Sequence, residues 1–463
     1  MRVSFGSRRL AGGRVRFEMA ESKHMTRQRD FKKLVRERMR RTGESYTTAR
    51  SHLLIEEPSH ASTLPGLIAG YACFGGLQGD TSVLTNVLRF AGLRKPDGRE
   101  YSEALVAGLC GGIGFLYAVF EYRGMPPMLT IIARSNSMAD AFITEGLGRC
   151  GAQLDTREAS TEGAAMKHLL SALDAGKPAL CTVDMVSLPY SGMPAQWAGM
   201  SPHVVAAVGR HGDSIWLDDR AVEPIAISMA EFAHARSRYR KGKNRLVTLR
   251  GRTQGFDLAQ AVREAVALTV KSFHQSPVKS FASNFGFAGL EKWQRLLTDK
   301  RDPKGWPKVF ASGREALAGL GRAYECLQHE YTGPAAGRPL YAEFLAEAAW
   351  ITGDNRFAEV AQKFRASGVL WDGLTERIRH CPDAAVKRRC EITDIRAELL
   401  DAQGSKATPQ LKALFDERME LGNECKLDAA GAGELYAAIA GDLGRIIGLE
   451  REAVEQLRTL SSN

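Results

Sequence analysis

The chain has 463 residues, of which 44% are hydrophobic and 25% are charged, a composition ordinary for globular proteins. This length exceeds what one hydrophobic core usually supports, so we expect two large domains and an appendage. No stretch approaches the roughly 18 apolar residues of a membrane span, which excludes a helical membrane protein. The N-terminal arginines precede no apolar run, so we expect no secretory signal and predict a cytoplasmic protein.

The net charge of +10 is unevenly distributed. The first 60 residues contain 15 Lys and Arg against 7 Asp and Glu, a net charge of +8, so only +2 remains for the rest of the chain. Basicity is therefore a property of the N-terminal extension. We do not expect the main body to bind nucleic acid.

The N-terminal extension divides into two segments. Residues 1–24 are Gly- and Arg-rich without periodicity, which predicts a disordered basic tail. Residues 25–58 show apolar residues at helical spacing on both sides of a break at Thr42-Gly43, which predicts a short basic helical hairpin. Such a module either docks to nucleic acid or an acidic protein, or is a solvated amphipathic hairpin.

Residues 59–252 mix helical and strand patterns, with helices first and strands afterwards, an order typical of an α+β domain. The predicted helices are 80–91, with Asp80 or Thr81 as N-cap, 102–109, 139–149, 162–175 and 229–238. The predicted strands are 115–120, 128–133, 179–184, 203–208, 215–218 and 246–249.

Residues 253–463 lack strand patterns and carry apolar stripes at helical spacing, which predicts an all-α domain. The predicted helices are 259–273, 313–329, 339–352, 356–366, 386–402, 409–421 and 434–460.

The eight cysteines are scattered, without a CxxC pair or the His spacing of a zinc site. We therefore expect reduced, mostly buried thiols, with no disulfide and no metal. The segment GGIGFLY (residues 111–117) lacks the GxGxxG spacing of a dinucleotide loop, so we expect no nucleotide and no other cofactor.

The segment SPHVVAAVGRHGDSIWLDDRA is the one most suggestive of chemistry. His203 opens one predicted strand, Asp219 follows the next, and a hairpin between them lets the two side chains meet. A carboxylate beside an imidazole fixes its tautomer and stabilises the imidazolium, as a general base requires. The alternative from spacing alone is a structural His and an Asp-Asp turn, with Asp218 exposed.

Several motifs in order carry a family resemblance: SEALVAGLCGGIGFLY (102–117), GKPALCTVDMVSLPY (176–190), the strand from His203, WLDDRA (216–221) and ISMAEFAHARS (227–237). Together they resemble the butirosin biosynthesis protein H N-terminal family, which is similar in fold to papain-like cysteine peptidases. The segments NFGFAGLEKWQRLLTDKRDPKGWPKVF and RPLYAEFLAEAAWITGD resemble the helical domain that usually follows. The resemblance implies a papain-like domain and a C-terminal helical domain.

The resemblance implies acyl transfer from a carrier-protein thioester to the amine of a small molecule, with His203 as base and Asp219 as the acid that orients it. The family's nucleophilic thiol sits at the N-terminus of the first helix of the domain, where the helix dipole lowers its pKa. Counting back from Leu84, Asn86 and Leu88, which match that helix, places this thiol near Gly79. The sequence has no cysteine there.

Three interpretations remain open at this stage. In the first, Cys73 is the nucleophile. In the second, a hydroxyl of Thr81 or Ser82 replaces the thiol, although each is equally explained as an N-cap. In the third, covalent catalysis is lost, and His203 either deprotonates an amine directly or only binds a ligand. Gln78 is a candidate donor to an oxyanion. Asp184, after a predicted strand, borders the cleft or caps the strand end.

The leading hypothesis is an amide-forming acyltransferase of specialised metabolism, whose partners are an acyl carrier protein and a small-molecule amine. The alternatives are a cysteine-peptidase-like hydrolase and a non-catalytic binding or scaffold protein on the same fold.

Overall fold

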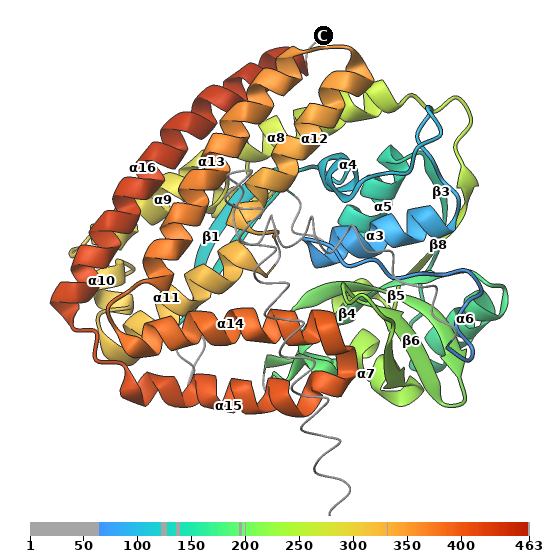
Figure 1. Ribbon diagram of the computed structural model, residues 1–463, viewed down its shortest axis with the longest axis horizontal. Coiled ribbons are helices and arrows are strands. Elements are labelled where there is room, and N and C mark those ends of the chain that lie inside the picture. The colour runs from blue at the N-terminus through green and yellow to red at the C-terminus, as the bar shows by residue number, and fades with distance from the viewer. Residues whose placement is uncertain are drawn as a thin grey trace, which may run out of the picture. The chain divides into compact units, whose positions relative to one another are not determined.

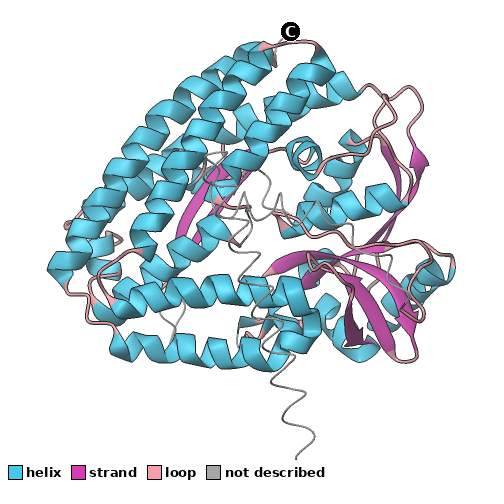
Figure 2. Ribbon diagram, in the orientation of Figure 1, coloured by secondary structure: helices cyan, strands magenta, loops and turns pink. Residues whose placement is uncertain are grey.

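The computed structural model describes residues 64–121, 127–135, 139–193, 197–199, 201–330 and 332–461. The predicted tail and helical hairpin of residues 1–58 lie outside the described residues. The described part has a sheet-containing N-terminal region and a helical C-terminal region, so the prediction of a mixed domain followed by a helical one is confirmed (Figure 2). No described helix is long and apolar enough to cross a membrane.

The strands are β1 (Ile113–Phe120), β2 (Met128–Arg134), β3 (Ala152–Arg157), β4 (Ala179–Asp184), β5 (Pro202–His211), β6 (Ser214–Asp218), β7 (Ile225–Ser228) and β8 (Leu246–Arg252). Among the described residues, six of them form an antiparallel sheet in the order β3-β8-β4-β5-β6-β7. Strand β1 pairs with β2, and its Leu116 also makes an isolated antiparallel bridge to Phe285. β3 and β7 were not predicted, because β3 is half-exposed with little apolar alternation and β7 is only four residues long.

The helices of the N-terminal region are α3 (Gly79–Phe90), α4 (Glu103–Leu109), α5 (Ala139–Arg149), α6 (Glu162–Asp174) and α7 (Met229–Arg238). Helix α3 packs on one face of the sheet while α6 and α7 pack on the other (Figure 1). Strand β5 has apolar side chains on both faces, which is why helices cover both faces of the sheet. Val204, Ala206 and Val208 join one buried cluster, and Val205 and Ala207 join the other.

The helices of the C-terminal region are α8 (Leu258–His274), α9 (Gly286–Thr298), α10 (Trp306–Val309), α11 (Gly313–Gln328), α12 (Arg338–Thr352), α13 (Arg356–Arg379), α14 (Ala384–Gln403), α15 (Thr408–Glu424) and α16 (Ala429–Leu460). Helix α13 is longer than predicted because it continues through Gly368. A Cβ there would lie 3.1 Å from the ring of Pro339, so the small residue serves close packing on α12 rather than ending the helix.

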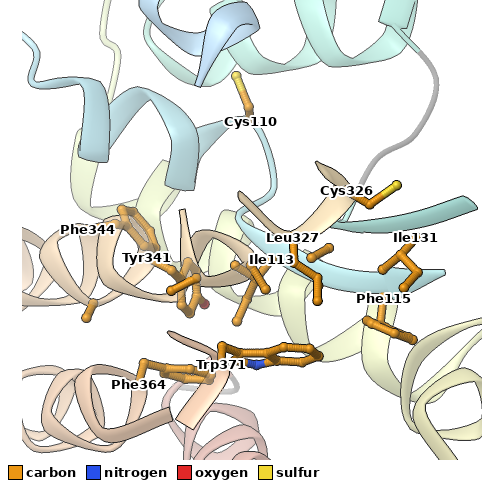
Figure 3. Packing of buried hydrophobic residues seen from close by; sticks show 14 of the residues in the cluster. Cys110, Ile113, Phe115, Ile131, Cys326, Leu327, Tyr341, Phe344, Phe364 and Trp371 are labelled. Carbon is orange, nitrogen blue, oxygen red and sulfur yellow. The ribbon is translucent and has the colours of Figure 1, made fainter. Parts of the chain in front are cut away.

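The β1–β2 hairpin lies apart from the six-stranded sheet and packs among the helices of the C-terminal region. Figure 3 shows Phe115 of β1 and Ile131 of β2 beside Leu327 and Trp371. The Phe115 ring stacks 6.0 Å from Trp293 and 6.1 Å from Trp371. The two regions therefore share one hydrophobic core.

Candidate functional site

His203 and Asp219 meet as the hairpin predicted. His203 lies at the start of β5, and Asp219 directly follows β6, which is the antiparallel partner of β5. Nε2 of His203 donates to Oδ1 of Asp219 over 2.6 Å, and the buried Tyr190 hydroxyl donates to Oδ2 over 2.6 Å. Both carboxylate oxygens are thus engaged, which fixes the orientation of the imidazole.

The electrostatics favour a charged pair. Burial opposes ionisation of Asp219, but the His203 charge and the hydrogen bonds from His203 and Tyr190 outweigh it and lower the pKa of Asp219. Burial likewise opposes the imidazolium, yet Asp219, with a smaller contribution from Asp80, raises the pKa of His203. His203 is therefore held toward the imidazolium form, which can donate a proton.

Asp80, the second residue of α3, is a site residue that the sequence analysis missed. Its Oδ1 lies 3.8 Å from Nδ1 of His203, and its Oδ2 accepts from the buried guanidinium of Arg134 at the end of β2. The prediction that Asp80 or Thr81 is the N-cap is wrong, because Gln78 is the N-cap and makes no side-chain cap hydrogen bond. The sequence signal for Asp80 was a carboxylate in the first turn of a helix, which is typical of helix capping as well as of a functional site.

A cavity of about 170 Å³ opens beside this pair and is lined from both regions of the chain. The sheet-containing region contributes Gln78, Gly79, Asp80, Met185, Leu188, Tyr190, Ser191, Met193, His203, Asp219 and Arg220. The helical region contributes Glu325, His329, Glu330, Thr332, Thr393, Arg396, Ala397, Leu400 and Leu411. None of the helical-region residues was predicted as a site, since single polar residues on amphipathic helices look like solvated positions.

Two stretches of the chain match known family models. Residues 78–220 match the family model described as butirosin biosynthesis protein H, N-terminal. The chain carries a domain of the butirosin biosynthesis protein H N-terminal family. Residues 228–405 match a second model, described as a domain of unknown function, and no curated protein matches the chain. The predicted family and its following domain are confirmed.

The butirosin biosynthesis protein H-like domain carries glycine where the resemblance implies a nucleophilic thiol. Gly79 is the first residue of α3, and a Cβ built on it would lie 3.7 Å from Cε1 of His203, its nearest neighbour. The preceding loop is fixed by Glu103, whose two carboxylate oxygens accept the N–H groups of Leu77 and Gln78 over 2.9 Å each. The position beside the imidazole is thus well formed but has no nucleophilic side chain.

The three alternative nucleophiles do not line the cavity among the described residues. Cys73 is 2% exposed, and burial, followed by the charge of Asp218, raises the pKa of its thiol well above the usual value. Thr81 donates to Gln78 O over 3.2 Å and to Glu103 over 3.0 Å, whereas Ser82 donates to Gly79 O over 2.8 Å. These contacts give both hydroxyls a role in holding the start of α3.

Of the two remaining candidates, only Gln78 faces the cavity. Asp184 is buried at the end of β4 and accepts from the Ser187 backbone N–H over 3.1 Å and the Ser187 hydroxyl over 2.6 Å. Asp184 therefore caps the turn after the strand. Asp218 also lies away from the cavity, and the prediction that it is exposed is wrong: it is buried and accepts from Tyr71 over 2.6 Å and Asn86 over 3.0 Å.

Proposed function

We propose that this chain is an amide-forming acyltransferase on a papain-like domain, and that it transfers the acyl group directly from a carrier-protein thioester to a small-molecule amine. The observation that carries the proposal is the His203–Asp219–Tyr190 arrangement, set beside the N-terminus of α3 in a cavity, in a domain of this family. An oriented imidazole paired with a carboxylate is a recurrent component of acyl-transfer sites.

Gly79 favours direct transfer over an acyl-enzyme intermediate. In direct transfer the amine nitrogen attacks the thioester carbonyl carbon, the N–C bond forms, and the C–S bond breaks. The His203 imidazolium gives its proton to the departing sulfur, and the amine proton passes to a base in the cavity. The raised pKa of His203 suits this acid role better than the base role expected from the sequence.

The oxyanion that develops on the carbonyl oxygen needs hydrogen-bond donors. The first N–H groups of a helix have no acceptor within the helix, so those at the start of α3, where Gly79 and Asp80 line the cavity, are candidate donors. The Gln78 side chain lines the same cavity and is a further donor. These groups, rather than a covalent bond, would stabilise the transition state.

Gly79 also bears on the alternatives. A cysteine-peptidase-like hydrolase needs a thiol beside His203, and among the described residues no cysteine lines the cavity, so this alternative loses support. A non-catalytic protein that binds an acyl group or amine in the cavity needs no nucleophile and stays the second candidate.

The test is transfer from acetyl and benzoyl N-acetylcysteamine thioesters to 1,4-diaminobutane, followed as amide formed and thiol released. We expect wild-type protein to transfer without a stable acyl-protein adduct in intact mass spectra. His203→Ala should lower the rate by about 10²- to 10⁴-fold, the usual contribution of a general acid or base. His211→Ala, an exposed histidine at the far end of the same strand, is the matched control and should be unchanged.

Absence of both transfer and hydrolysis in wild-type protein would overturn the acyltransferase proposal and support the binding protein. Equal activity in wild type and His203→Ala would show that the pair is not catalytic.

A further inference from the structure

The helical region brings a second His–Asp pair to the same cavity. His329 follows the last residue of α11, and its Nε2 lies 2.9 Å from Oδ1 of Asp394 on α14. His329 lines the cavity with 18% of its side chain exposed, whereas Asp394 lies behind it. The cavity is therefore bordered by two histidines, one from each region of the chain.

Asp394 is held in place independently of His329. The Tyr324 hydroxyl donates to its two oxygens over 3.0 and 3.1 Å, and the Arg379 guanidinium pairs with Oδ2. The Asp394 charge is thus balanced by Arg379, whereas the described side chains that hydrogen-bond Asp219 are His203 and Tyr190. Asp394 can therefore fix the orientation of the His329 ring.

The tautomer follows from this contact. A carboxylate accepts, so Nε2 of a neutral His329 carries the hydrogen and Nδ1 carries the lone pair. No protein hydrogen bond to Nδ1 is found among the described residues around it.

We propose that His329, oriented by Asp394, is the base that takes the proton from the attacking amine. This inference rests on the proposed acyl transfer. The nitrogen forms its bond to the carbonyl carbon and loses a proton to Nδ1 of His329, and the departing sulfur receives a proton from His203. His329 gains one proton and His203 loses one, so proton exchange with solvent returns both histidines to their starting states. In this scheme the domain of unknown function supplies half of the acid–base chemistry.

Comparing two nucleophiles tests whether His329 acts as the base or has another role in the site. Both nucleophiles attack as the neutral amine, but the N–H of attacking hydroxylamine, a weak base, is acidic and is lost with little help. The N–H of attacking 1,4-diaminobutane, a strong base, is far less acidic and needs a base to remove it. With benzoyl N-acetylcysteamine thioester as donor, His329→Gln and His329→Ala should lower kcat with 1,4-diaminobutane by about 10²-fold or more and leave the rate with hydroxylamine within about threefold. The Gln variant keeps a donor for Asp394 and guards against loss of structure.

Asp394→Asn should show the same selective loss to a smaller extent, since Asp394 is a positioning residue. His380→Ala is the matched control, because His380 lies in the same region with 73% of its side chain exposed. His203→Ala should lose activity with both nucleophiles.

Equal loss with both nucleophiles in His329→Gln, or no loss with either, would overturn the role of His329 while wild-type transfer still upholds the proposed function. If wild-type protein transferred to neither nucleophile, the proposed function itself would fail, and this inference with it.

Discussion

The proposed direct acyl transfer depends on Gly79 more than on any other residue of the site. Its backbone conformation accepts a side chain, and a Cβ would meet nothing closer than 3.7 Å. The side chain added there would sit beside the His203 imidazole at the start of α3, where the helix dipole and a neighbouring imidazolium stabilise a thiolate. The site is thus one substitution away from a cysteine nucleophile.

Gly79→Cys should therefore create a reactive thiol. We expect it to react with iodoacetamide roughly tenfold or more faster than the eight native cysteines, of which seven are buried and one is half-buried. Incubation with a thioester should give an acyl adduct visible in intact mass spectra, which wild-type protein and Gly79→Ala do not give. The adduct should disappear when His203→Ala is combined with Gly79→Cys. A thiol at position 79 that is no more reactive than the native ones would contradict the geometry of the site.

Asp218 and Asp219 show how neighbouring carboxylates take different protonation states. Successive residues of an extended chain point in opposite directions, so Asp219 reaches His203 while Asp218 enters the core beneath α3. Burial raises the pKa of Asp218 from 3.8 to about 7, despite the hydrogen bonds from Tyr71 and Asn86. The adjacent carboxyl on the cavity side stays ionised.

This difference predicts a pH dependence of stability. Between pH 3.8 and about 7 the folded state keeps the proton on Asp218 and the unfolded state has lost it. The stability that Asp218 contributes is thus fully present below the unfolded pKa and is lost as the pH rises toward about 7. Relative to Asp218→Asn, wild-type protein should lose up to about 1.4 kcal/mol of unfolding free energy per pH unit in this window, measured by urea unfolding. Parallel pH profiles for the two proteins would contradict the raised pKa.

At the scale of elements, the site depends on α3, the β5–β6 hairpin and the β1–β2 hairpin. Most of these elements were predicted from the sequence, because each is formed by residues adjacent in the chain, such as the apolar run 128–133 or the turn at Gly212. The position of β1–β2 was not predictable in this way. Its two strands are apolar runs like those of other buried strands, and only packing against Trp293 and Trp371 shows that the hairpin belongs among the helices. That placement brings Arg134 to Asp80.

At the scale of the whole molecule, a buried ion pair links elements far apart in the sequence. Glu450 of α16 receives two hydrogen bonds from Arg338 of α12, each 2.8 Å, and further ones from Ser367 over 2.6 Å and Trp371 over 2.9 Å, both on α13. Arg338 also donates to the carbonyl of Ala133 in β2 over 3.2 Å. Burial opposes the charge of Glu450, but Arg338 and these donors lower its pKa, so it stays ionised.

Glu450→Gln should destabilise the protein by about 3–5 kcal/mol, because it leaves the Arg338 guanidinium buried without a counter-charge. Glu452→Gln is the matched control: its partner Lys363 lies 2.9 Å away on the surface, and losing an exposed pair costs only about 0–1 kcal/mol. The comparison is made by urea unfolding followed by tryptophan fluorescence. Similar losses in the two variants would mean that the buried pair is not the link between these helices.

The sequence by itself predicted a mixed region followed by a helical one, the order of most elements and the pairing of His203 with Asp219, since each depends on local periodicity or on one hairpin. Its motifs, through their resemblance to a known family, indicated the family. The resemblance, with a count back along one helix, implied a thiol near Gly79, where the sequence has none. Only the tertiary structure decided that Cys73 is buried away from the cavity, that Asp80 faces His203, and that His329 reaches the cavity. The physical reason is that these contacts join residues from separate elements, whose approach depends on how the helical region packs on the sheet-containing one.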